Sequence, residues 1–164
     1  PKQLTKSIAS NHTVFELKEN LLLHLQNLRF DYFDFGTYNK YSTNYADYAH
    51  LVSKNIKSSE YKFAILICGT GQGMNMSANK HSDVRAALCW NEDIAEMSRK
   101  HNDANILCLP GRYINDLDSK IIVTKFLTTE FEGGRHSERI KKIPKISNVE
   151  EDPKFESWRV HDMS

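Results

Sequence analysis

A cysteine followed by three alternating glycines is the part of the sequence best suited to chemistry. The segment Cys68-Gly69-Thr70-Gly71-Gln72-Gly73 directly follows an apolar run that begins at Phe63, which places it at the carboxyl end of an expected strand. Glycines let backbone N–H groups approach an anion closely, and a helix that follows them adds its positive end. A thiol in such a place is stabilised as the thiolate, which can abstract a proton or attack an electrophile. The alternative is a tight turn that only joins a strand to a helix, with Cys68 as an ordinary core residue.

The spacing of this loop argues against two common nucleotide-binding motifs. A dinucleotide-binding G-x-G-x-x-G would need a glycine where Met74 stands, and no acidic residue closes the next apolar run, which ends Leu88-Cys89-Trp90. A phosphate-binding loop of the G-x-x-x-x-G-K type is also missing from the sequence. Cys89 and Cys108 also lie at expected strand ends but without such a glycine loop, and we expect both to be buried core residues.

Two of the seven histidines stand beside expected strands. His12 follows the first strand in Ser10-Asn11-His12-Thr13, so it should share one edge of the sheet with Cys68. His101 precedes the last strand, so the crossover helix has returned the chain to the opposite edge. The alternative for His101 is a cation at a helix C-terminus, where the dipole favours it. Four other histidines are expected to be solvated surface residues: His24, His50, His81 and His161.

Two arginines near the end of the chain could bind an anion. Arg135 and Arg139 are four residues apart, so on a helix they share a face and can grip a phosphate with forked donors. The alternative is a solvated basic helix, because residues 135–145 hold five Lys and Arg against Glu138 alone.

Short apolar runs alternate with helical patterns along most of the chain, which predicts right-handed crossovers and a parallel sheet with helices on both faces. The run from Phe63 to Cys68 is too apolar to alternate faces, as expected for a central strand covered on both sides. The apolar runs lie at residues 7–9, 32–35, 63–68, 84–89 and 106–109, and the helical patterns at residues 15–25 and 121–126.

Size and composition predict one domain with a substantial core. The chain has 164 residues, a mass of 19.0 kDa and a formal charge of +1, so no global field recruits nucleic acid or an anionic membrane. Three widely spaced cysteines favour a reducing compartment, no apolar run approaches a membrane span, and no signal-peptide segment opens the sequence. We therefore expect a cytoplasmic protein. Residues 1–147 are expected to form the domain, and residues 148–164 an irregular acidic tail.

Several segments together resemble ribose-5-phosphate isomerase of type B and its relatives, the galactose-6-phosphate isomerase subunits. The similarity covers roughly residues 5–146 and implies a Rossmann-like three-layer sandwich with a five-stranded parallel sheet. It also implies an aldose–ketose isomerisation through an enediolate, on ribose 5-phosphate and ribulose 5-phosphate, without metal or cofactor. The matching segments are Ile67-Cys68-Gly69-Thr70-Gly71, Ala78-Asn79-Lys80, Arg85-Ala86-Ala87-Leu88, His101-Asn102-Asp103-Ala104-Asn105 and Phe131-Glu132-Gly133-Gly134-Arg135-His136, with Asp34-Phe35-Gly36-Thr37, Tyr45 and Tyr48.

The resemblance implies a role for each candidate residue. Cys68 is the implied base that moves a proton between C1 and C2, and Thr70 relays a proton between the substrate oxygens. His101 is the implied acid that opens the furanose ring, and Asn102 assists at the enediolate. The implied substrate-binding residues are Asn11, the backbone of Gly69, Gly71, Gln72 and Gly73 at the oxyanion, Tyr45 at the sugar hydroxyls, and His12, Arg112, Arg135 and Arg139 at the phosphate.

Topology then predicts an active site shared between two chains. Cys68 follows a strand and His101 precedes one, so a strand about 17 Å long separates them within a chain. A homodimer in which each chain lends His101 to the other's Cys68 is the economical solution, and a tetramer stays open as an alternative. The family's dimeric architecture implies the same.

The sequence also departs from the family pattern. Asn11 stands where the family usually has an aspartate, Asn44-Tyr45-Ala46 replaces Asp-Tyr-Pro, and Gln72 replaces an aliphatic residue. Asn11 cannot serve as a carboxylate base. Two alternatives therefore stay open: an isomerase of a six-carbon sugar phosphate, such as allose or galactose 6-phosphate, and a non-catalytic sugar-phosphate binder.

Overall fold

The computed structural model describes residues 5–10, 14–36, 44–57 and 61–145 of the chain. The chain divides into two compact units, residues 1–133 and residues 134–164, which are considered separately. The predicted acidic tail, residues 148–164, lies outside the described residues.

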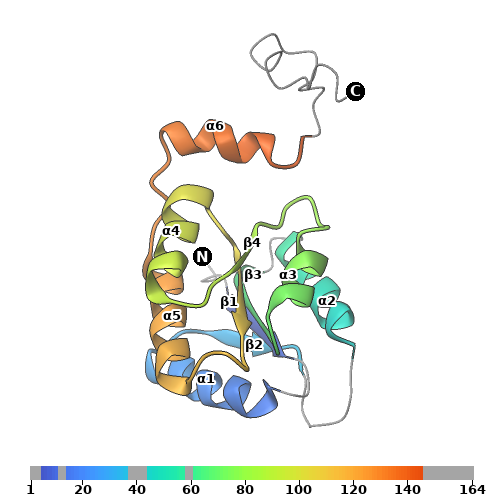
Figure 1. The fold of residues 1–164 in the computed structure, drawn as a ribbon, viewed down its shortest axis with the longest axis vertical. Helices are drawn as coiled ribbons and strands as arrows, with labels where there is room; N and C mark the ends of the chain where they lie inside the picture. The colour runs from blue at the N-terminus through green and yellow to red at the C-terminus, as the bar shows by residue number, and fades with distance from the viewer. Residues whose placement is uncertain (1–4, 11–13, 37–43, 58–60, 146–164) are drawn as a thin grey trace, which may run out of the picture. The chain divides into compact units, whose positions relative to one another are not determined.

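The first unit is built on a five-stranded parallel sheet, which confirms the predicted α/β sandwich (Figure 1). The strands lie in the order β2-β1-β3-β5-β4. Their bounds are β1 Thr5–Ser10, β2 Tyr32–Asp34, β3 Tyr61–Cys68, β4 Ala86–Leu88 and β5 Ile106–Pro110. Each strand coincides with one of the apolar runs of the sequence.

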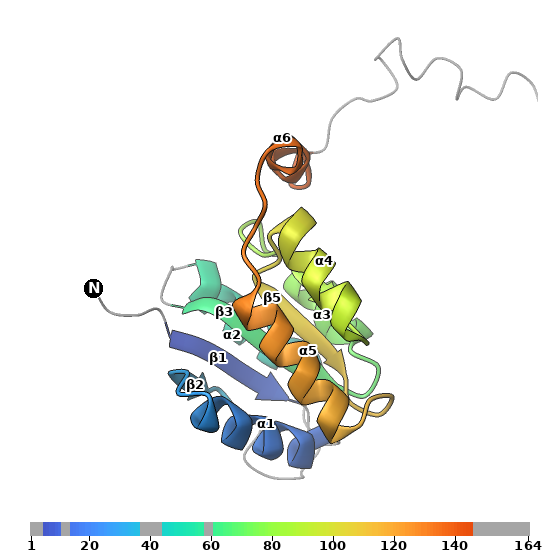
Figure 2. The ribbon, with the colours of Figure 1, turned by 90° about the vertical axis from the view of Figure 1, so that its left-hand side faces the viewer.

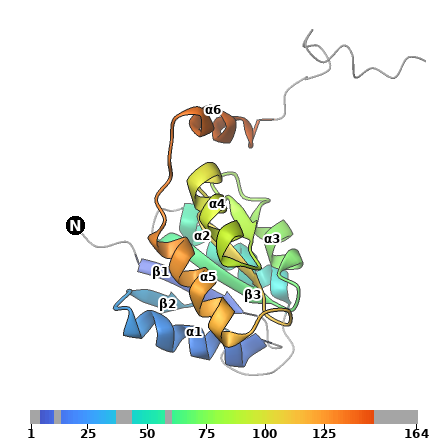
Figure 3. The ribbon, with the colours of Figure 1, turned by 60° about the vertical axis from the view of Figure 1, so that its left-hand side comes forward.

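Five helices cover the two faces of this sheet (Figure 2). Helices α1, α4 and α5 pack on one face, where Leu21 and Phe126 are fully buried, and α2 and α3 pack on the other, around Met74. Figure 3 shows α5 lying across the sheet from α2 and α3. The helices are α1 Phe15–Asn27, α2 Tyr45–Lys57, α3 Gln72–Ala78, α4 Glu92–Asn102 and α5 Asp116–Thr128.

Strand β3 is the central strand that its composition predicted. Seven of its eight residues are buried, all except Lys62, because helices cover it on both faces. Its last residue is Cys68, and the glycine loop follows. The carboxyl ends of β1 and β3 lie side by side, since Ser10 pairs with Ile67.

The strand order reverses between β1 and β3, because the chain leaves β1 toward β2 and later returns to the other side of β1 as β3. In open parallel sheets, ligands bind beyond the carboxyl ends of the strands at such a reversal. The fold therefore directs attention to the segments that follow Ser10 and Cys68. The described part of the second unit is helix α6, Arg135–Lys142, with its preceding turn and the residues up to 145.

Within the described ranges, no helix is both long enough and apolar enough to cross a membrane.

Candidate active site

The glycine loop makes a tight turn between β3 and α3. Gly71 caps α3 in the left-handed region, at φ 75°. A Cβ at this position would lie 2.5 Å from Cδ1 of Leu88 and 3.1 Å from the backbone of Leu109, so no side chain fits. The alternating glycines thus bring the loop backbone close against β4 and β5, directly beyond Cys68.

Cys68 lies beneath this loop, on the face of the sheet that α2 and α3 cover. The residue is only 4% exposed and packs with Ala9, Met74 and Cys108 in one apolar cluster. Its carbonyl accepts a hydrogen bond from the Gly111 N–H at 2.9 Å, which fixes the strand end. A thiol shielded from bulk water suits the transfer of a proton from carbon, because water cannot compete for that proton.

Thr70 and Gln72 lie on the exposed side of the loop. The Gln72 N–H donates to Thr70 Oγ1 at 3.3 Å. A hydroxyl that accepts a hydrogen bond from the backbone can still donate its own proton. Thr70 therefore presents a proton donor on the loop that follows Cys68.

Two candidate substrate-binding residues contact the glycine loop because two glycines leave room for them. A Cβ at Gly69 would lie 3.2 Å from both Cδ and Nε of Arg112, and the Arg112 N–H donates to the Gly69 carbonyl at 3.0 Å. A Cβ at Gly73 would lie 2.5 Å from Cε2 of the Tyr45 ring. The structure thus gathers a guanidinium and a phenol around the loop that follows Cys68. The candidates Asn11 and His12 lie outside the described residues.

His101 and Asn102 lie at the opposite edge of the sheet, in the last turn of α4 and before β5 begins. The register of β3 and β5 pairs Ala64 with Ile106 and Cys68 with Pro110. The level at which β5 begins is therefore about 13 Å below the level of Cys68, at about 3.3 Å per residue. Within one chain, the structure does not bring His101 to Cys68.

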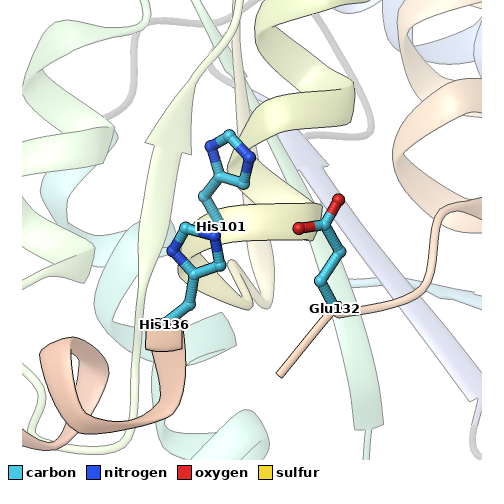
Figure 4. A group of neighbouring side chains, drawn as sticks. All are labelled: His101, Glu132 and His136. Atoms are coloured by element: carbon cyan, nitrogen blue, oxygen red, sulfur yellow. The ribbon is translucent and has the colours of Figure 1, made fainter. Parts of the chain in front are cut away.

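His101 has a carboxylate neighbour that the sequence analysis did not identify. Glu132 follows α5, and its N–H donates to the carbonyl of Lys100 at 3.2 Å. A carboxylate oxygen of Glu132 lies within 4.8 Å of a ring nitrogen of His101 (Figure 4). The only sequence signal was its place in the segment Phe131-Glu132-Gly133-Gly134-Arg135-His136, to which no role for Glu132 was attached.

Arg135 and Arg139 belong to the second unit. Both lie on α6, four residues apart, as their spacing predicted. Helix α6 is rich in basic residues, and Lys141 donates to Glu138 at 3.1 Å within it.

The other two cysteines are core residues, as predicted. Cys89 and Cys108 are fully buried and make no disulfide. Burial raises the pKa of the Cys89 thiol to about 11, and burial raises the pKa of the Cys108 thiol well above its ordinary value. Both thiols are therefore kept in the protonated, unreactive form at neutral pH.

We expect iodoacetamide at pH 8 to leave Cys89 and Cys108 unmodified in the native protein, because the thiolate is the reactive form. Any native labelling is expected at Cys68, the least enclosed of the three. Peptide mass mapping after brief exposure checks this, with a sample unfolded in urea as the control in which all three cysteines react. Native labelling of Cys108 would contradict its burial.

Three histidines expected on the surface are instead half-buried, which corrects that prediction. His24 shares a 2.8 Å hydrogen bond with Thr124 Oγ1, and burial, followed by the charge of Lys120, lowers the pKa of His24. His50 and His81 join α2 to the turn after α3 through an Nδ1···Nε2 hydrogen bond of 2.8 Å. Sequence spacing alone could not reveal partners that tertiary packing supplies. His161 lies outside the described residues.

Comparisons with known proteins agree with the resemblance. Residues 7–143 match the sequence model of a family described as ribose/galactose isomerase. The ribose-5-phosphate isomerase B of Escherichia coli K12 is 37% identical over 136 residues, which are 83% of this chain and 91% of that protein.

Two crystal structures show the same fold. A ribose 5-phosphate isomerase from Thermotoga maritima is similar at a TM-score of 0.85 and 46% identity, over 88% of this chain and 99% of that one. Ribose-5-phosphate isomerase B from Mycoplasma genitalium was solved with bound ribulose-5-phosphate. It is similar at a TM-score of 0.82 and 43% identity, over 87% of this chain and 95% of that one. The structure places Cys68 next to a glycine loop, at the strand-order reversal of a five-stranded parallel sheet. Together with the family match over residues 7–143, this shows that the chain belongs to the ribose/galactose isomerase family.

Proposed function

We propose that this chain interconverts ribose 5-phosphate and ribulose 5-phosphate, with Cys68 as the base. The observation that carries the proposal is the position of Cys68 at the end of β3, below a loop whose glycines admit Arg112 and Tyr45. Relatives of 37% to 46% identity named as ribose-5-phosphate isomerases support the substrate, and one of them was solved with ribulose-5-phosphate.

The proton transfers balance without a cofactor. The Cys68 thiolate removes the C2 proton of the open-chain aldose, and the electron pair of that bond forms a C1–C2 double bond as charge moves to O1. Thr70 relays a proton from O2 to O1. The thiol then returns its proton to C1, the carbonyl forms at C2, and the thiolate is regenerated. Backbone N–H groups from Gly69 to Gly73 stabilise the charged intermediate, because preorganised donors act strongly where water is excluded.

The proposal assigns the rest of the substrate to other side chains. A phosphate needs forked or multiple cationic donors, which His12, Arg112, Arg135 and Arg139 supply in the proposal. Tyr45 contacts the sugar hydroxyls.

A homodimer completes the site. His101 and Asn102 lie at the edge of the sheet opposite to Cys68, so a second copy of the chain provides them. His101 of the second copy donates a proton to the ring oxygen of the furanose, which opens it to the reactive aldehyde. Three free cysteines favour a reducing compartment, and we place the enzyme in the cytoplasm. Its proposed substrate and product belong to the pentose phosphate pathway.

A six-carbon sugar phosphate is the second candidate substrate, because the matched family includes galactose isomerases as well as ribose isomerases. The chemistry at C1 and C2 is the same, and only the length between the carbonyl and the phosphate differs. Comparison of kcat/KM values therefore distinguishes the two candidate substrate classes.

We expect a value of kcat/KM for ribose 5-phosphate at least about tenfold above the values for allose 6-phosphate and galactose 6-phosphate, since one misfitting carbon costs on the order of 1–3 kcal/mol of transition-state binding. A coupled assay of ketose formation from the three aldoses measures this. A higher kcat/KM for either hexose phosphate would show that this hexose phosphate, and not ribose 5-phosphate, is the substrate. Thermal stabilisation by all three compounds without turnover would show that the protein binds sugar phosphates but does not isomerise them.

A further inference from the structure

We propose that Arg99, Asp103 and Arg85 position His101 for catalysis. This inference rests on the proposed function and deepens it. The proposal gives none of the three residues a contact with the substrate. They act instead through the end of α4, where His101 lies two residues before Asp103.

Asp103 ends α4 in the left-handed conformation. It is the C-cap, at φ 47° and ψ 45°, and only Arg29 among the other described non-glycine residues has a positive φ. The left-handed region is disfavoured for residues with a Cβ. In this conformation the backbone N–H of Asp103 donates to the Arg99 carbonyl, and the backbone N–H of Ala104 donates to the Ser98 carbonyl. These two hydrogen bonds end the helix directly after Asn102. The direction of the final turn, and thus of His101, depends on it.

Two arginines form hydrogen bonds with Asp103. Arg99 Nη1 donates to Asp103 Oδ1 at 2.9 Å. Arg85 Nη2 donates to Oδ2 at 3.3 Å, and Arg85 Nε donates to the Asp103 carbonyl at 2.9 Å. Three bonds from two long side chains therefore fix both the backbone and the carboxylate of one residue.

Arg99 anchors this cluster in the protein core. Its side chain is only 4% exposed, and its guanidinium lies 4.7 Å from the centre of the Phe63 ring. It also donates to the carbonyls of Ala104 at 2.6 Å and Thr129 at 3.1 Å. A buried guanidinium needs such partners, since an unpaired charge in the interior is costly. Arg99 thereby ties the end of α4 to the residues that follow α5.

Arg85 joins the cluster to the sheet. Its N–H donates to Asn105 Oδ1 at 2.7 Å, and its carbonyl accepts the Asn105 N–H at 2.9 Å. These bonds link the start of β4 to the start of β5. The cluster therefore fixes the turn carrying His101 to a rigid part of the sheet, as a catalytic group on a helix end requires.

The first test is the variant Asp103→Gly, which removes the carboxylate but accepts a positive φ. We expect kcat for ribose 5-phosphate to fall about 10- to 100-fold with KM changed less than about twofold, because a misplaced catalytic group slows chemistry more than binding. Asp93→Asn, an exposed carboxylate in the first turn of the same helix, is the matched control and is expected to retain wild-type kcat. Wild-type kcat in Asp103→Gly would overturn the inference.

A mixing experiment separates positioning of His101 from damage to the whole fold. Asp103→Gly is mixed with Cys68→Ala and subunits are exchanged, so that hybrids combine an intact Cys68 with the correctly held His101 of the other chain. We expect recovery to about a quarter of wild-type activity, from half the dimers having one intact site each. No recovery, with hybrids verified by native mass spectrometry and with His101→Ala and Cys68→Ala complementing each other in parallel, would overturn the inference.

Arg85→Lys keeps the test informative if Asp103→Gly does not fold. Lysine retains the charge but cannot contact the carboxylate and the carbonyl together, so a smaller fall in kcat, about three- to tenfold, is expected. Unchanged kcat in this variant would count against the role of Arg85. An inactive wild-type protein would instead refute the proposed function, which distinguishes the two failures.

Discussion

Replacing Cys68 with alanine will lower kcat for ribose 5-phosphate by about a thousandfold, the contribution typical of a positioned general base. Binding of the phosphate will persist, because Arg112 contacts the loop from the turn after β5 and does not depend on the thiol. Steady-state kinetics measures the loss. Loss of C2–deuterium cleavage in ribose 5-phosphate labelled at C2 shows that the missing step is proton transfer at carbon.

Cys108→Ala is the matched control for Cys68→Ala. Both cysteines belong to the same apolar cluster on the same face of the sheet, so both variants remove a buried sulfur atom. Only the Cys68 variant should lose turnover. Retention of C2–deuterium cleavage in Cys68→Ala would remove this residue from the mechanism and point to another base.

A mixture of His101→Ala and Cys68→Ala proteins will regain activity that neither protein has alone. In a hybrid dimer, one site combines Cys68 of the first chain with His101 of the second. Random exchange makes about half of the dimers hybrid, and each has one intact site, so about a quarter of wild-type activity is expected. Assays before and after subunit exchange by mild denaturant measure the recovery.

The double variant Cys68→Ala/His101→Ala, mixed with either single variant, is the control for this recovery. It can form hybrids but supplies neither group, so activity should stay at the level of the single variants. Absence of recovery in verified hybrids of the two single variants would place both groups in one chain's own site, contrary to the sheet register.

The sheet could be predicted because its strands are short apolar runs. Strand β3 is apolar along its length and is buried on both faces, so its central position followed from composition. Strand β2 was harder to bound, since the expected run continues to Phe35 while the strand ends at Asp34. Edge strands carry less apolar signal because only part of their surface is covered.

The charged part of the core could not be predicted. Lys18 is fully buried in α1 and donates to Asp34 at 2.7 Å, and Arg99 lies against Phe63. Residues of these types are rarely buried unless paired, and the partners are distant in sequence. Helical periodicity therefore predicts that Lys18 and Arg99 face solvent.

The candidate site was predictable in part. The positions of strand ends and crossover helices predicted that the loop after β3 and His101 lie at opposite edges of the sheet. The approach of Tyr45 to Gly73 could not be predicted, because it depends on how α2 packs against α3. The pairing of Arg85 with Asp103 was equally hidden, although both stand in segments that resemble the family.

The separation between the end of β3, where Cys68 lies, and the start of β5, which His101 precedes, also governs how defective copies would behave among normal ones. In the proposed dimer, a copy lacking only Cys68 or only His101 leaves one working centre when it joins a healthy copy. A copy lacking both silences the pair completely, although it still folds and associates. Such a double defect would be dominant, and each single defect would be largely masked.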